Sequence, residues 1–140
     1  MSNKKALFPT TLTSESLDCL KNVISYCEEN NLELYILYTY RLISHGSNQS
    51  GSSQSIKKEL ENKATFIFNK LEEEILSKSK IKYTFLSEVG FITDRVILTL
   101  NKHDIDSVIL CSACADLLET EMKGNDPNIT IDNKPVILID

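Results

Sequence analysis

Residues Leu32 to Tyr40 read Leu-Glu-Leu-Tyr-Ile-Leu-Tyr-Thr-Tyr, a run that is nearly all apolar and rich in aromatic and β-branched side chains. A strand with one solvated face alternates apolar and polar residues, whereas a strand covered on both faces is apolar almost throughout. The run therefore predicts a central strand of a sheet that is covered by helices on both faces.

Strands and amphipathic helices alternate on both sides of this run. The expected elements, in order, are a strand over 5–9, a helix that begins at Ser14 or Ser16 and stops at Asn30-Asn31, the strand 32–40, a helix over about 55–77, a strand over 81–85, a helix capped by Thr93, a strand over 106–111, a short helix over 115–123, one helical turn after the loop 124–127, and a strand over 135–139. Such alternation is typical of a parallel sheet with helices on both faces. Ligands of these sheets bind at the carboxyl ends of the strands, which places candidate sites in the loops 9–13, 39–41 and 111–115.

Composition limits the function classes. The chain has 140 residues, the usual size of one domain, so we expect a single domain over 1–140 with a flexible Ser- and Gly-rich loop over 44–55. The net charge of −5 argues against nucleic-acid binding, which needs a basic face. No apolar stretch reaches the length of a membrane span and no export signal is visible, so we expect a cytoplasmic protein, without membrane contact, whose cysteines are thiols.

Several stretches resemble the universal stress protein family, in order and with the family's spacing. Pro9-Thr10-Thr11 stands where the family has Pro-Thr-Asp, and Leu34 to Thr39 is similar to its second strand. Gly90 stands where a glycine leads the family's third helix, and Asp106-Ser-Val-Ile-Leu-Cys111 resembles Asp-Leu-Ile-Val-Met-Gly. Pro135-Val-Ile-Leu-Ile is similar to the family's closing strand. The resemblance implies a Rossmann-like α/β fold with a five-stranded parallel, doubly wound sheet of order 3-2-1-4-5.

The family's ATP-binding members carry two glycines three residues apart, then nine residues, then Gly followed by Ser or Thr. The same offsets here give Cys111, Cys114, Gly124 and Asn125. The resemblance implies a nucleotide site made of Pro9, Thr10, Thr11, Thr39, Leu110, Cys111, Ala113, Cys114, Gly124 and Asn125. Glycine lets backbone N–H groups approach phosphate closely, and a cysteine side chain puts bulk there. We therefore expect weak or absent ATP binding, and the alternative is an altered site that still binds ATP or AMP.

Cys111-Ser-Ala-Cys114 is also a C-x-x-C pair, which in a cytosolic α/β protein can act in thiol redox chemistry. The alternative is that two small residues fill the space of lost glycines. His45 and His103 are far apart in sequence and have no partners in a triad or zinc pattern, so we expect no catalytic residues and no metal site.

The resemblance implies a homodimer formed through the last strand. Pro135, Val136, Ile137, Leu138 and Ile139 give an independent reason, because an apolar strand at a sheet edge tends to pair with another chain. The sequence is thus interpreted as a dimeric, non-enzymatic stress-response module. The alternatives are a nucleotide-binding protein and a thiol redox protein.

Overall fold

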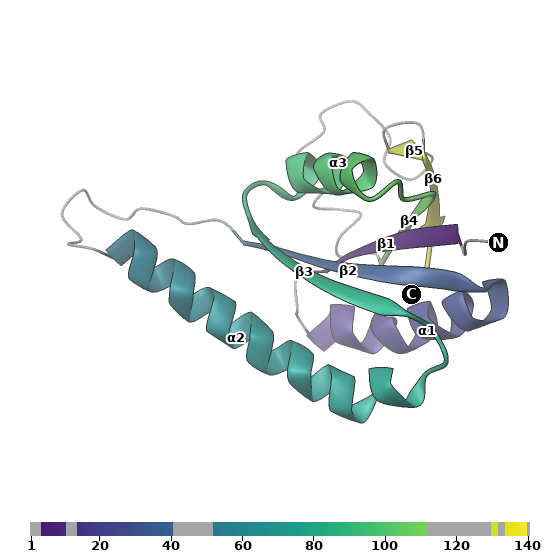
Figure 1. Ribbon diagram of the computed structural model, residues 1–140, viewed down its shortest axis with the longest axis horizontal. Helices are drawn as coiled ribbons and strands as arrows, with labels where there is room; N and C mark the ends of the chain where they lie inside the picture. The colour runs from purple at the N-terminus through teal and green to yellow at the C-terminus, as the bar shows by residue number, and fades with distance from the viewer. Residues whose placement is uncertain (1–3, 11–13, 41–51, 112–129, 132–133, 140) are drawn as a thin grey trace.

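The computed structural model describes residues 4–10, 14–40, 52–111, 130–131 and 134–139. Its elements, in order, are β1 (Lys4–Thr10), α1 (Ser14–Asn30), β2 (Leu32–Tyr40), α2 (Ser52–Glu74), a 3-10 turn (Leu76–Lys78), β3 (Tyr83–Val89), α3 (Ile92–Lys102), β4 (Ser107–Leu110), β5 (Thr130–Ile131) and β6 (Lys134–Leu138). Figure 1 shows three layers, with α1 and α2 on one face of the sheet and α3 on the other.

The strand order is β3-β2-β1-β4-β6-β5. Five strands run parallel to their neighbours, and β6 is the predicted last strand, so the predicted order 3-2-1-4-5 is confirmed. The short strand β5 is an addition that the sequence did not indicate. It pairs antiparallel with the start of β6, Thr130 opposite Pro135 and Ile131 opposite Lys134. The helical turn expected after the loop 124–127 is therefore wrong at Thr130 and Ile131, where β-branched side chains favour extended backbone.

The central strands form the core, as the run 32–40 predicts. Leu34, Ile36 and Leu37 on β2 are at most 1% exposed, and Phe8 on β1 is equally buried. The register of β1 with β2 runs without interruption from Lys4 opposite Leu32 to Thr10 opposite Tyr38. The carboxyl ends of these strands therefore lie at one edge of the sheet.

Helix α1 buries one face and ends abruptly. Leu20, Ile24 and Cys27, which follow one another at spacings of four and three, are buried against the sheet. Asn31 follows the helix with φ 54° and stands directly before β2, so a single left-handed residue joins helix to strand. The predicted stop at Asn30-Asn31 is confirmed.

Helix α2 packs on the edge strand β3 through aromatic side chains. The rings of Phe68 and Phe85 stack with centroids 4.2 Å apart, and the Tyr83 hydroxyl donates a hydrogen bond of 3.1 Å to Glu72. The helix begins at Ser52, earlier than expected, so residues 52–55 of the predicted 44–55 loop are helical. Serine and glutamine are compatible with a first helical turn, and residues 44–51 lie outside the described residues.

The segment around Gly90 differs from the sequence prediction in its bounds. Strand β3 covers 83–89 rather than 81–85, since Leu86, Ser87 and Glu88 continue the ladder beside β2. Gly90, with φ +139°, then turns the chain into α3. The N-cap position is Phe91 rather than Thr93, and it makes no side-chain cap hydrogen bond.

Candidate functional site

The carboxyl edge of the sheet contains a topological switch point between β1 and β4. From β1 the chain proceeds to one side, through β2 and β3, and from β4 to the other, through β6. Leu7 lies opposite Val108, so the carboxyl ends of the two strands, at Thr10 and Leu110, lie at the same edge of the sheet. Crevices at such points are where ligands of open α/β sheets bind.

The predicted site residues at this edge are tightly packed. Thr10 is 1% exposed, Leu110 is fully buried and Cys111 is 3% exposed. Pro9 is buried beside them on β1, and the backbone N–H of Ile139 donates a 2.9 Å hydrogen bond to the carbonyl oxygen of Leu110. The structure thus places Pro9, Thr10, Leu110 and Cys111 at the same edge of the sheet. All four are buried, and the Leu110 carbonyl oxygen is already hydrogen-bonded.

Thr39 lies on the next strand, one residue beyond the Thr10–Tyr38 pair, and is partly exposed. Burial raises the pKa of the neighbouring Tyr38 hydroxyl, which keeps that hydroxyl neutral around pH 7. The other predicted site residues, Thr11, Ala113, Cys114, Gly124 and Asn125, lie outside the described residues, as does the expected helix over 115–123.

The three cysteines that the structure describes are buried thiols: Cys19, Cys27 and Cys111. The Cys19 thiol donates a 3.0 Å hydrogen bond to the carbonyl oxygen of Ile139. Burial, with a smaller effect of Glu28, raises the pKa of Cys27 to about 12. Reactive thiols are exposed and have a depressed pKa, so Cys19 and Cys27 have a packing role.

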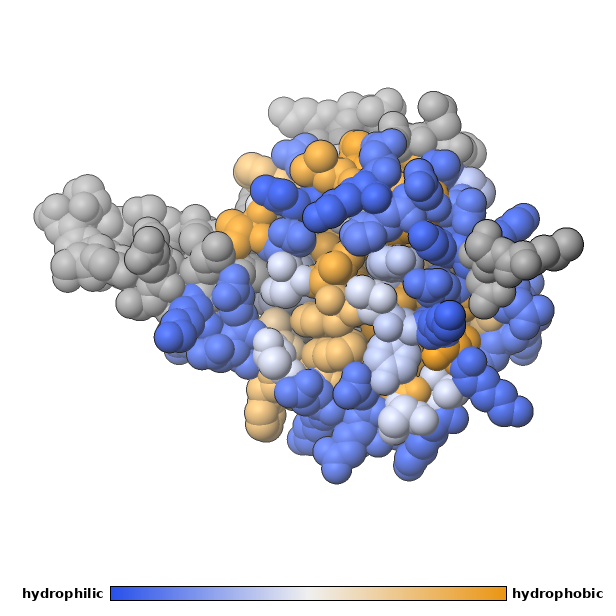
Figure 2. Space-filling view, in the orientation of Figure 1, coloured by the Kyte–Doolittle hydropathy of each residue, from blue (hydrophilic) through white to orange (hydrophobic). Residues whose placement is uncertain are grey.

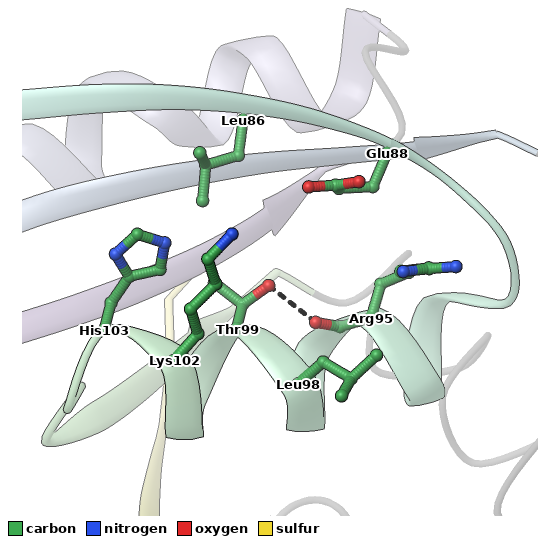
Figure 3. A pocket seen from close by; sticks show the side chains of 7 residues that line it. All are labelled: Leu86, Glu88, Arg95, Leu98, Thr99, Lys102 and His103. Atoms are coloured by element: carbon green, nitrogen blue, oxygen red, sulfur yellow. Dashed lines mark hydrogen bonds between the residues drawn. The ribbon is translucent and has the colours of Figure 1, made fainter.

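A pocket that the sequence analysis missed lies between β3 and α3. It has a volume of about 280 Å³ and is lined by Leu86, Glu88, Arg95, Leu98, Thr99, Lys102 and His103. Figure 3 shows Leu86 and Glu88 pointing from the strand toward the helix. The signal was present in the spacing, because 86 and 88 share a face of a strand while 95, 98, 99 and 102 share a face of a helix.

A second pocket of the same volume lies at the amino edge, lined by Cys27, Glu28, Asn31, Leu32, Lys80, Ile81 and Lys82. Neither pocket includes a residue of the predicted nucleotide site. Among the described residues, His, Cys, Asp and Glu side chains do not gather in groups of three or more that could hold a metal ion. None of the helices in the described ranges is both long and apolar enough to cross a membrane.

Comparison with solved structures identifies the fold. The universal stress protein UspA from Lactobacillus plantarum aligns over all of both chains with a TM-score of 0.76 and 10% identity. A universal stress protein in complex with cAMP aligns over 99% of this chain and 97% of its own, with a TM-score of 0.62 and 12% identity. One from Archaeoglobus fulgidus, in complex with dAMP, aligns over 99% and 98%, with a TM-score of 0.55 and 12% identity. The sequence matches no protein-family model and no curated protein.

The five parallel strands, their order and the switch-point edge define a doubly wound, Rossmann-like α/β protein. Within that class, the chain has the fold of the universal stress proteins, over its full length. The resemblance drawn from the sequence is confirmed at the level of the fold.

Proposed function

We propose that the chain is a divergent universal stress protein, cytoplasmic and homodimeric, that acts as a non-catalytic stress-response module and binds ATP weakly or not at all. The observation that supports this most directly is the packing of Cys111. Its side chain, 3% exposed, directly follows the last residue of β4, at the position where the resemblance has the first glycine of the phosphate loop.

The argument against tight ATP binding is steric. Phosphate oxygens are held by backbone N–H groups that small residues leave accessible. At this switch point Thr10, which ends β1, and Cys111, which follows β4, are both buried, so side chains fill the strand ends. A glycine at 111 would remove the thiol and open that space.

Calorimetric titration of the reduced protein with Mg-ATP tests the proposal. We expect no saturable heat in the micromolar range, and no phosphate release on incubation with Mg-ATP. Cys111→Gly is expected to gain ATP affinity, whereas Cys27→Ala, which removes a buried thiol at the other end of the sheet, leaves it unchanged. Micromolar binding by the wild-type protein would overturn this function, and phosphate release would overturn its non-catalytic part.

A second candidate function is the binding of an AMP-type nucleotide. Two structural neighbours are complexes with cAMP and dAMP. A monophosphate has fewer phosphate oxygens for the altered loop to bind than a triphosphate has. The partly exposed Thr39 stands where the resemblance places an adenine contact. Titration with AMP after ATP separates the candidates. Binding of AMP without ATP, with thermal stabilisation that rises with ligand concentration, would favour this second function.

Dimerisation is proposed through β6. Leu138 is 54% exposed, which is a large apolar area for the edge region of a sheet. The sequence predicted that this strand forms the edge of the sheet, which is wrong at its start, because β5 pairs with Lys134 and Pro135 on the outer side of β6. The segment from Val136 onward extends past β5, with no further strand paired on that side among the described residues. A second copy pairing there would bury Leu138.

Light scattering after size-exclusion chromatography measures the assembly at micromolar concentration. We expect a dimer for the wild-type chain and a monomer for Leu138→Lys. Phe66→Lys is the matched control, because Phe66 is 69% exposed on α2, away from β6. A wild-type monomer, or a dimer that survives Leu138→Lys, would remove this part of the proposal.

A further inference from the structure

The pocket between β3 and α3 has a specific pattern of charge. Glu88 projects from the strand wall, and Figure 3 shows it between Lys102 and Arg95, which project from the helix wall. The helix positions of the two cations are seven residues apart, about 10 Å along the axis. Along the pocket the charges therefore run positive, negative, positive.

These charges are not neutralised by one another. Within the described ranges, no hydrogen bond or ion pair within 4.0 Å joins Glu88 to Lys102 or to Arg95. The Arg95 Nε atom is buried and makes no hydrogen bond there.

The remaining walls of the pocket are apolar or already satisfied. Leu86 faces the pocket from β3, and Leu98, 56% exposed, borders it on α3. The Thr99 hydroxyl donates a 2.6 Å hydrogen bond to the Arg95 carbonyl oxygen within the helix, so it is not the group that attracts a ligand. The volume of about 280 Å³ lies near the lower limit, about 300 Å³, of the usual range for small-molecule pockets, so a small ligand fits best.

The neighbourhood holds the pocket in place. His103, at one end, packs its ring on Tyr35 with centroids 5.0 Å apart, and Lys5 donates a 3.0 Å hydrogen bond to the His103 carbonyl oxygen. At the other end the Arg95 side chain lies against Gly90, where a Cβ would come within 2.8 Å of Nε. Both ends are therefore fixed by packing, which limits the entropy lost on binding.

We propose that this pocket binds a small amino dicarboxylate, the chemical class of glutamate and aspartate. Its two carboxylates would pair with Lys102 and Arg95, its ammonium group with Glu88, and its methylene groups would contact Leu86 and Leu98. The charge pattern of the ligand, negative, positive, negative, is the complement of the pocket. The net charge of −1 likewise balances two cations and one carboxylate. The site is separate from the proposed nucleotide site and does not depend on it.

The test is calorimetric titration of the full chain with L-glutamate, L-aspartate and glutarate, which has both carboxylates but no ammonium group. We expect saturable binding of at least one amino acid in the millimolar range or tighter, and weaker binding of glutarate. Lys102→Gln and Arg95→Gln should each weaken amino acid binding about tenfold or more, the usual cost of a lost charged partner. Glu88→Gln should remove the preference over glutarate, while Lys70→Gln, a control on the exposed face of α2, should change nothing.

Backbone amide NMR on the wild-type chain provides a second readout that needs no variant. L-glutamate should shift the amides of 86–90 and 95–103, and excess Mg-ATP should not reverse the shifts. The proposal is wrong if neither amino acid binds at a concentration of about 10 mM or if glutarate binds as tightly as the amino acids. It is also wrong if the shifted amides lie outside 86–90 and 95–103. Whether or not the protein binds ATP has no bearing on these outcomes, so this proposal and the proposed function can each fail without the other.

Discussion

Replacement of Gly90 by alanine should destabilise the protein through the backbone more than through the side chain. Gly90 has φ +139°, a conformation that residues with a Cβ rarely adopt, and strain of this kind costs about 1–3 kcal/mol. Alanine also reduces the conformational entropy of the unfolded chain, which stabilises the folded state by about 0.4–1 kcal/mol. The net expected loss is about 1–2 kcal/mol.

The new methyl group would also meet Arg95, with the ideal Cβ 2.8 Å from Nε. Because that side chain is long and can change rotamer, this contact is expected to add only about 0.5–1.5 kcal/mol. Urea unfolding of Gly90→Ala, Arg95→Ala and the double variant separates the two effects. In the Arg95→Ala background, Gly90→Ala should still lower the free energy of unfolding by about 1 kcal/mol.

Thermal unfolding gives an independent value. With about 2.1 cal/mol/K of unfolding entropy per residue over 140 residues, a loss of about 1–2 kcal/mol lowers Tm by about 3–7 °C. A change in the free energy of unfolding below about 0.5 kcal/mol, the usual range for neutral surface substitutions, would refute the backbone argument. So would a cost that disappears entirely once Arg95 is alanine.

Four further outcomes are expected. Leu37→Ala, at a fully buried position of β2, should lower the free energy of unfolding by about 2–5 kcal/mol, whereas Phe66→Ala, at a position 69% exposed, should change it by less than about 0.5 kcal/mol in urea titrations. The pKa of Cys27 is raised from 9.0 to about 12, so the stability that its neutral thiol contributes is complete below about pH 9 and is lost as the pH rises toward 12. Urea midpoints above pH 9 should therefore fall more steeply for the wild-type chain than for Cys27→Ala, by up to about 1.4 kcal/mol per pH unit, and equal slopes would count against this reasoning. Asp104→Gly, at an exposed position with φ 51°, should be neutral or stabilising by up to about 1 kcal/mol, and Asp104→Val should be destabilising, as calorimetric Tm values would show. Alkylation of the native protein should be slow at Cys19 and Cys27 compared with the urea-unfolded chain, and equal rates would contradict their burial.

The sheet was predictable because the central strand can be recognised from its own apolar composition. The run 32–40 is nearly all apolar, and β2 covers that range with its core residues buried. Asn31 and Gly90 marked the ends of elements, and both have positive φ. The sequence prediction ended strand β3 at residue 85, too early, because Ser87 and Glu88 are residue types common in loops. They are tolerated since β3 is an edge strand whose residues are all partly exposed.

The candidate site was predicted less completely. Thr10 and Cys111 come to the same edge of the sheet because β1 and β4 are parallel neighbours, which follows from the order of the sheet and is not visible in either stretch alone. The pocket at α3 was missed because its residues come from two elements whose relative position depends on packing. Lys102, Arg95 and Glu88 look individually like ordinary surface charges, and only the fold places one carboxylate between two cations.

Figure 2 shows that apolar and weakly polar side chains follow β3 between the charged surfaces of α2 and α3. This strand ends the sheet order, so its outer backbone groups have no neighbouring strand within the described residues. Lys82, exposed just before β3, and Glu88 within it place charge along this edge, a common means of discouraging pairing with other chains.

The junction between α1 and β2 has a consequence for how the chain can change length. Only Asn31 separates the last helical residue, Asn30, from the first strand residue, Leu32. One inserted residue that entered the strand would exchange its two faces, since side chains alternate along β2. Both faces are apolar, so hydrophobicity would survive, but Tyr35 would leave its contact with His103 and Leu34 its place against β3. Evolution and engineering can therefore lengthen this protein more readily elsewhere than at residue 31.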